Sequence, residues 1–299
     1  GLSSIVLTSN QADYGPADVR HDLHVIRKWA GDLNQLSTTA LMDETVAAIM
    51  SAAARYYPEL PTRAICRMIM ADIKAESDFD TNNVSGGRLD SGSSWGLMQV
   101  SPDGGSQELK LFKDHVVTST NDYSWEKTVS SSHAGPLLDW KTGKEMKVST
   151  LTNQDLFRPW INIHMASWIQ SNLARTSSQD PYDWTAISKA SVKARNSTLA
   201  QQANPNSASL SKTATSAWDK VKTLLVGSGL PRSLETGLGS WVAGPAMDGE
   251  GSYKQDGDEI SDQYLITIAE SLTVLYGNPV GTDWLGGLLL NAGLVDFKA

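Results

Sequence analysis

Apolar residues recur at helical spacing along most of the chain. Over residues 41–57 the small and apolar side chains fall on one stripe, which predicts a helix that Pro58 ends. Pro61 predicts the first turn of a second helix. Four residues of this second helix form one apolar face: Ile65, Met68, Ile69 and Ile73. The same period predicts further helices over about residues 19–29, 153–174, 181–194, 208–226 and 260–276.

A long irregular stretch interrupts the helical pattern. Between Asp78 and Gly105 the composition changes to Gly, Ser, Asn and Asp, which predicts loops and a small hairpin. Loops of this length inside a compact domain are usually functional or disordered. We therefore expect a mostly α fold with a small irregular or β excursion, and the excursion is the first place to look for a site.

Charge and composition exclude several classes of protein. The 299 residues include 33 acidic and 25 basic side chains, and the net charge of −8 argues against a nucleic-acid partner. No apolar run approaches the roughly 18 residues that a membrane span needs, so we expect no membrane partner. Cys66 is the single cysteine, which excludes an internal disulfide and a structural cysteine–zinc site.

Composition and possible glycosylation sites favour secretion. The chain begins with neither Met nor a basic segment, so we expect a processed or trimmed start from which any secretion signal has already been removed. Ser and Thr supply much of the polar composition, and possible glycosylation sequons begin at Asn83 and Asn196. We therefore expect a secreted, extracellular protein.

Glu76 is the strongest candidate for catalysis. Ile73, Ile69 and Ile65 precede it by three, seven and eleven residues, so all four share one helix face. Burial disfavours the charged form of a carboxyl and raises its pKa. A glycosidase general acid needs such a carboxyl, still protonated near the working pH. The alternative is that Glu76 only ends the helix, with a solvated side chain.

Two further segments change the balance between these alternatives. Residues 76–79 (Glu-Ser-Asp-Phe) end the helix, and residues 94–102 (Ser-Trp-Gly-Leu-Met-Gln-Val-Ser-Pro) follow after the Gly/Ser loop. The pair resembles the signature of the soluble lytic transglycosylases and goose-type lysozymes, glycoside hydrolase family 23. Residues 157–163 (Phe-Arg-Pro-Trp-Ile-Asn-Ile) are similar to a later element of that family. The resemblance covers roughly residues 60–200.

This resemblance implies roles for individual residues. Glu76 would be the catalytic acid, and Asn162 and residues 94–99 would shape the substrate cleft: Ser94, Trp95, Gly96, Leu97, Met98 and Gln99. Asp90 has the spacing of a family Asp that precedes Gly-Leu-Met-Gln by six residues, whereas a second family Asp is replaced here by Ser101. Inverting hydrolysis needs a second carboxylate roughly 6.5–9.5 Å from the acid. We expect Asp90 to supply it, although its alternative role is that of a turn-forming residue.

A third family element, Ala-Tyr-Asn-Ala-Gly, is poorly matched. The nearest segment, 192–197, keeps Asn196 as a substrate-binding candidate but has Arg195 in place of the Tyr. An arginine beside Glu76 would depress the pKa of that carboxyl and oppose its acid role. Among the aromatic residues, Trp95 and Trp125 are the candidates for stacking against sugar rings.

The fold implied by the resemblance is α+β and lysozyme-like: a helical bundle around a catalytic cleft, with a C-terminal helical extension. We expect an N-terminal extension over residues 1–40 and a catalytic domain over 41–226, with an insertion at about 119–150. Residues 227–299 would form the C-terminal extension, packed on the same domain.

The function expected is that of a monomeric muramidase that needs no cofactor or metal. It would hydrolyse the β-1,4 bond between N-acetylmuramic acid and N-acetylglucosamine in peptidoglycan. A lytic transglycosylase that forms 1,6-anhydro products remains open. Peptidoglycan is itself anionic and the chain carries −8, so chitin or chitosan is the alternative substrate. A wall-binding protein without turnover is the non-enzymatic alternative.

Overall fold

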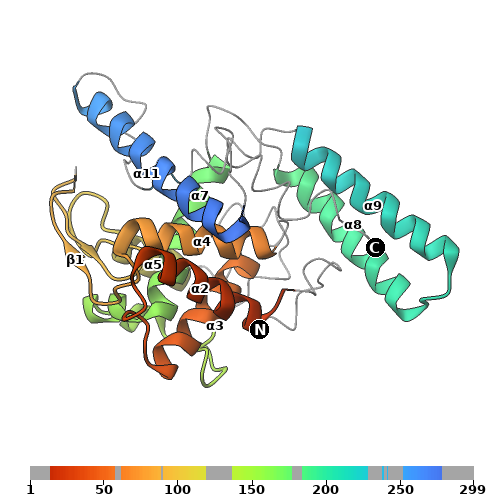
Figure 1. Cartoon of the computed structure of the whole chain (residues 1–299), viewed down its shortest axis with the longest axis horizontal. Coiled ribbons are helices and arrows are strands. Elements are labelled where there is room, and N and C mark those ends of the chain that lie inside the picture. Colours follow the sequence, from red (N-terminus) through yellow and green to blue (C-terminus); the bar gives the residue numbers. More distant parts are fainter. Residues whose placement is uncertain are drawn as a thin grey trace.

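The computed structural model describes residues 14–57, 62–88, 90–118, 137–176, 184–227, 238, 241 and 252–277 (Figure 1). The α-helices of these residues are α2 (Pro16–Ala30), α3 (Thr39–Tyr56), α4 (Thr62–Ser77), α5 (Glu108–Thr118), α7 (Pro159–Thr176), α8 (Trp184–Ala203), α9 (Ala208–Gly227) and α11 (Ser252–Tyr276). Two short 3-10 helices, η2 (Val148–Thr150) and η3 (Asn153–Phe157), precede α7. Strands β1 (Val84–Ser85) and β2 (Ser94–Trp95) pair antiparallel. The prediction of a mostly α protein with a small β excursion is confirmed.

Helix α4 lies at the centre of the main body. It packs against α2, α3 and α11, and α3 packs in turn against α7. The four residues of its predicted apolar face are at most 1% exposed. Its other face is also covered, with Ala64, Cys66 and Met70 completely buried. Because both faces are packed, the position and direction of this helix are fixed by the core, and so is the residue at its end.

The segments before residue 41 and after residue 227 contribute to the same core. Val19, Leu23 and Ile26 of α2 are fully buried, as are Ile268 and Leu272 of α11. An ion pair of 2.8 Å between Arg67 Nε and Asp22 Oδ2 links α4 to α2. The guanidinium of Arg67 also lies 4.5 Å from the ring centroid of Tyr276, at the end of α11. The described parts of both expected extensions are thus built into the main body.

Part of the expected insertion at 119–150 also packs on the body. Leu137 and Val148 are buried, and Trp140 Nε1 donates a hydrogen bond of 3.1 Å to Glu44 on α3. Residues 119–136, which include Trp125, lie outside the described residues.

Helices α8 and α9 form a hairpin that extends away from the rest of the molecule, on the right of Figure 1. The two helices pack mainly on each other, and Trp218 Nε1 donates a hydrogen bond of 2.7 Å across the hairpin to Thr198 Oγ1. Helix α8 continues nine residues beyond the predicted end at 194 and stops at Ala203. Asn204 then precedes Pro205, and a residue before proline disfavours the helical conformation.

Candidate active site

Glu76 lies in the last turn of α4, where the packed core reaches the protein surface. The residue is partly exposed although many protein atoms surround it. No described residue holds its carboxyl by a hydrogen bond or an ion pair. A carboxyl in this position is fixed by its helix but has both oxygens available to a ligand.

The surroundings of Glu76 favour its neutral form. Burial raises the pKa of the carboxyl well above its ordinary value, and the nearby carboxylates of Asp72 and Glu108 raise it further. Arg88 acts in the opposite direction and is the weaker influence. The sequence predicted this direction from the apolar stripe on α4, but it did not identify Asp72, Glu108 or Arg88.

Asp72 is a second carboxyl on α4, one helical turn before Glu76. It is completely buried, and the Gln170 side-chain amide donates a hydrogen bond to its Oδ2. Its other oxygen, Oδ1, is buried and has no hydrogen-bond partner among the described residues. Burial raises the pKa of Asp72 to about 7. Two carboxylates one helical turn apart in a packed interior repel each other, so both are rarely ionised at once. Asp72 therefore helps to keep at least one of the two carboxyls protonated.

Several contacts tie the loop after β2 to the end of α4. Ser77 Oγ donates a hydrogen bond of 2.7 Å to the Leu97 carbonyl. Asn162 accepts a hydrogen bond of 2.7 Å from the Met98 backbone N–H, and its amide donates to the Trp95 and Leu156 carbonyls at 2.8 Å. Asn162 is fully buried. This corrects the expectation that Asn162 contacts substrate, because its amide is already occupied in holding the loop from behind.

Gly96 is the residue on which this loop geometry depends. Its φ of +78° lies in the left-handed region that favours glycine. A Cβ at this position would lie 2.2 Å from the Leu156 carbonyl oxygen and 2.4 Å from Asn162 Nδ2. The Gly of the Gly-Leu-Met-Gln segment is therefore required by close packing.

Gln99 is also committed to the interior of the loop. Its amide accepts a hydrogen bond of 2.6 Å from Ser85 Oγ and donates to the Gly96 carbonyl at 2.9 Å and the Asn83 carbonyl at 3.1 Å. Leu97 and Met98 are at most 1% exposed. The Gln99 amide is thus occupied within the loop, and all three side chains build the loop beside Glu76.

Ser94 and Trp95, on β2, lie nearer the surface. The buried Ser94 hydroxyl accepts a hydrogen bond of 3.0 Å from Arg88. Trp95 is partly exposed, donates from Nε1 to Ser93 Oγ at 2.9 Å, and stacks on Phe157 at 5.1 Å between ring centroids. Of the residues predicted over 94–99, Trp95 is the one whose side chain retains partial access to solvent.

Asp90 is held as an anion by its own loop. It accepts hydrogen bonds from Arg88 at 3.0 and 3.4 Å, from the Gly92 N–H at 3.0 Å and from the Ser106 N–H at 3.1 Å. Burial acts to raise the pKa of Asp90, but these hydrogen bonds outweigh it and hold the pKa well below its usual range. A general base works best with a pKa near the working pH. The expected water-activating role of Asp90 is therefore corrected to that of a loop anchor.

Glu108 supplies a carboxyl that the sequence did not single out. It is the first residue of α5, a helix that was not predicted, and it is 5% exposed. Its Oε1 accepts a hydrogen bond of 2.6 Å from the Ser101 N–H and lies 3.5 Å from Arg88 Nη1. Burial raises the pKa of Glu108 to about 7, against the influence of Arg88. A carboxyl thus lies beside position 101, where the family resemblance places one.

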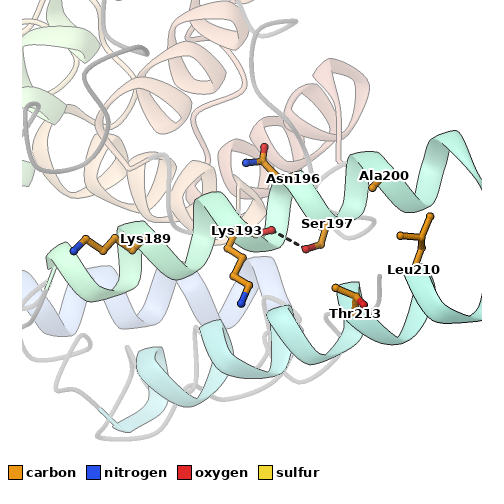
Figure 2. Close-up of a pocket in the computed structure, with 7 residues that line it drawn as sticks. All are labelled: Lys189, Lys193, Asn196, Ser197, Ala200, Leu210 and Thr213. Carbon is orange, nitrogen blue, oxygen red and sulfur yellow. Dashed lines mark hydrogen bonds between the residues drawn. The ribbon is translucent and has the colours of Figure 1, made fainter.

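Asn196 is not part of this cluster. It is exposed on α8, and Figure 1 shows that hairpin on the side of the molecule away from β1. It lines a hollow with Lys189, Lys193 and Leu210 of the same hairpin (Figure 2). The expected contribution of Asn196 to a cleft at Glu76 is corrected accordingly. The side chain of Arg195 lies outside the described residues.

The described residues contain neither a membrane-spanning helix nor a cluster of metal ligands. None of their helices combines the length and hydropathy needed to cross a bilayer. Within the same residues, no three His, Cys, Asp or Glu side chains are grouped so that they could hold a metal ion.

Comparison of the chain with known proteins finds no matching family model, no matching curated protein and no matching solved structure.

Proposed function

We propose that the protein cleaves the β-1,4 bond between N-acetylmuramic acid and N-acetylglucosamine in peptidoglycan, with Glu76 as the general acid. The observation that supports this most directly is the state of the Glu76 carboxyl. It is partly exposed, it is not bonded to any described residue, and its pKa is raised by burial and by two neighbouring carboxylates. The resemblance of residues 76–79 and 94–102 to glycoside hydrolase family 23 gives the substrate class.

In this mechanism the protonated Glu76 donates its proton to the glycosidic oxygen while the bond to the anomeric carbon breaks. Glu76 is left as a carboxylate. Arg88, whose charge lowers the pKa of Glu76, stabilises that product form. Asp72 and Glu108 act on the reactant side by keeping the proton on Glu76 before the bond breaks.

Hydrolysis also needs a group that accepts a proton from the attacking water. Asp90 is a poor choice, since its pKa is low and hydrogen bonds occupy both of its oxygens. We assign this step to Oε2 of Glu108, because Oε1 is bonded to the Ser101 N–H and the pKa of about 7 suits proton exchange near neutral pH. The water oxygen would then bond to the anomeric carbon while its proton passes to Glu108.

The constrained state of Asp90 also favours a second candidate, lytic transglycosylation. In that reaction the 6-hydroxyl of the muramic residue attacks its own anomeric carbon, and Glu76 serves as acid and then as base. No second carboxylate is needed. The product is a 1,6-anhydro sugar, lighter by one water than the hydrolysis product.

Mass spectrometry of the products from purified peptidoglycan tests both candidates. Reducing ends indicate hydrolysis and anhydro ends indicate transglycosylation. Chitosan and chitin digested in parallel test the alternative substrates. A folded protein that binds peptidoglycan but releases no fragments would contradict the proposal and favour a wall-binding role.

A further inference from the structure

The α8–α9 hairpin differs in charge from the rest of the chain. Residues 184–227 contain six basic residues and one acidic residue, Asp219, for a net charge of +5. Because the whole chain carries −8, the remaining residues carry −13. The hairpin that carries this positive charge extends away from the main body (Figure 1).

Four of these lysines line a continuous hollow between the two helices. One part is lined by Lys189 and Lys193 of α8 with Thr213 of α9, and the adjoining part shares these three residues and adds Lys212 and Lys220. Figure 2 shows the Lys193 side chain extending from α8 toward α9. We refer to this hollow as the lysine groove.

Within the part of the chain that the structure describes, no carboxylate forms an ion pair with the lysine groove. Its four lysines are exposed, and none of them forms an ion pair with a described residue. Of the described residues that line the groove, none is Asp or Glu; Asp219 lines the next hollow along α9, which shares Lys212 and Ser216 with the groove. Four ammonium groups along one groove without counter-charges attract an anionic ligand.

The neutral residues of the groove indicate what kind of anion it suits. Hydroxyl and amide groups come from Asn196, Ser197, Thr213 and Ser216, and the apolar part consists of Ala190, Ala200, Ala217, Leu210 and Leu224. Hydroxyl-rich edges beside small apolar patches match the edges and faces of sugar rings. No described lining residue is aromatic, so the described part of the groove offers none of the stacking platforms that single-stranded nucleic acids use.

The choice of lysine over arginine is also informative. Lysine presents a compact point charge, whereas arginine forms the bidentate pairs typical of phosphate recognition. The described lining of the groove contains lysine and no arginine. Separate carboxylates spaced along a flexible polymer suit such point charges.

We propose that the lysine groove is a docking site for a carboxylate-bearing glycan strand, apart from the site at Glu76. This inference rests on the proposed function, because it identifies the strand as the polymer that Glu76 cleaves. The peptides of peptidoglycan, and the muramic acid units that bear no peptide, carry the carboxylates. The groove would hold an anionic polymer that the acidic main body repels.

Co-sedimentation with purified peptidoglycan tests the docking site. The parent is the Glu76→Gln variant, which keeps the polymer intact during the measurement. Replacing Lys189, Lys193, Lys212 and Lys220 together by Gln should weaken binding at least about fourfold, since each exposed ion pair contributes at least about 0.2 kcal/mol. The matched control replaces four exposed lysines of the main body, Lys28, Lys141, Lys144 and Lys147, with the same change in net charge. The control should bind like the parent.

Two further arms identify the ligand. Amidation of the peptidoglycan carboxylates should abolish the difference between the groove variant and the parent, and added salt should reduce parent binding. Equal binding by the groove variant and the control, with both folded by circular dichroism, would overturn the proposal. The proposal would also be overturned if the groove variant lost binding to DNA or to anionic lipid vesicles but still bound peptidoglycan like the parent. Weak binding by the groove variant together with full turnover in Glu76→Gln would contradict the proposed function while leaving the docking site in place.

Discussion

The charged groups at the end of α4 and those on the α8–α9 hairpin differ in burial and in pairing. At the end of α4, Asp72, Asp90 and Glu108 are buried or held by directed hydrogen bonds, and Arg88 contacts two of them. On the hairpin, the lysines of the groove are exposed and have no described ion-pair partner. Proton transfer depends on distance and on a shifted pKa, which requires packing. Long-range attraction of a polymer depends on net charge and tolerates solvated, flexible side chains.

The difference implies that substitutions in the two regions affect different measurements. Changes at the end of α4 should alter turnover, its pH dependence or folding. Changes in the lysine groove should alter polymer binding and its salt dependence.

The largest expected effect comes from Glu76→Gln. The amide cannot donate the proton to the leaving oxygen, so the rate of peptidoglycan cleavage should fall at least about 100-fold, the low end for general acid catalysis. Fragment release is the measurement. Asp78→Asn is the matched control, because Asp78 is an exposed carboxyl two residues away. Sedimentation with peptidoglycan should be unchanged in Glu76→Gln. Turnover equal to that of the unmodified protein would remove Glu76 from the mechanism.

Gly96→Ala should show how rigid the loop beside Glu76 is. The added methyl group meets the Leu156 carbonyl and the Asn162 amide in a backbone conformation that alanine disfavours. We expect a loss of about 2–4 kcal/mol in the free energy of unfolding, from strain and displaced packing. Urea titration measures it. Gly86→Ala is the control, since a Cβ there meets nothing within 4 Å. Equal stability of the two variants would show that the loop adapts.

The substitution Asp90→Asn tests whether Asp90 anchors its loop or acts as the general base. The substitution weakens the pairing with Arg88 and should lower the free energy of unfolding by about 1–3 kcal/mol at neutral pH. Because folding depresses the pKa of Asp90, its contribution is present above the unfolded pKa and is lost as the pH falls toward the folded pKa. The destabilisation should therefore shrink in acid. Turnover should fall less than about tenfold, whereas a loss of about 100-fold or more would restore Asp90 as the base.

These comparisons also show which parts of the molecule a single sequence can predict. The apolar stripe on α4 placed Ile65, Ile69 and Ile73 in the core and Glu76 at its edge, because helical periodicity is a local property. The positive charge of residues 184–227 could likewise have been found by counting charges along the chain. Both signals are contained in short, continuous segments.

The sequence alone could not predict in which direction the polar side chains of the site form their hydrogen bonds. Asn162 and Gln99 were predicted as substrate contacts, yet both amides point into the loop. Glu108 is brought to Ser101 by the path of the chain after the Gly/Ser loop, and Asp72 is notable only once its buried partner Gln170 is known. Such roles depend on contacts between distant segments, which periodicity and spacing do not encode.

The smallest predicted effect is a change in pH dependence on replacing Asp72 by Asn. A carboxylate at Asp72 raises the pKa of Glu76, so its removal should lower that pKa. Turnover requires protonated Glu76 and declines as the pH rises through its pKa, so this decline should begin at a lower pH in the variant. Asp43→Asn is the control, since Asp43 pairs with Arg20 on the surface. An unmoved profile would show that the two carboxyls act independently.

Replacing Asp72 by Asn should also change how the free energy of unfolding depends on pH. Folding raises the pKa of Asp72 to about 7, so its contribution is fully present below the unfolded pKa and is lost as the pH rises toward 7. That loss is at most about 1.4 kcal/mol per pH unit. In Asp72→Asn the free energy of unfolding should change less between pH values of about 4 and 7. Urea titrations across this range measure it. A variant with the slope of the unmodified protein would show that Asp72 does not hold the proton in the folded core.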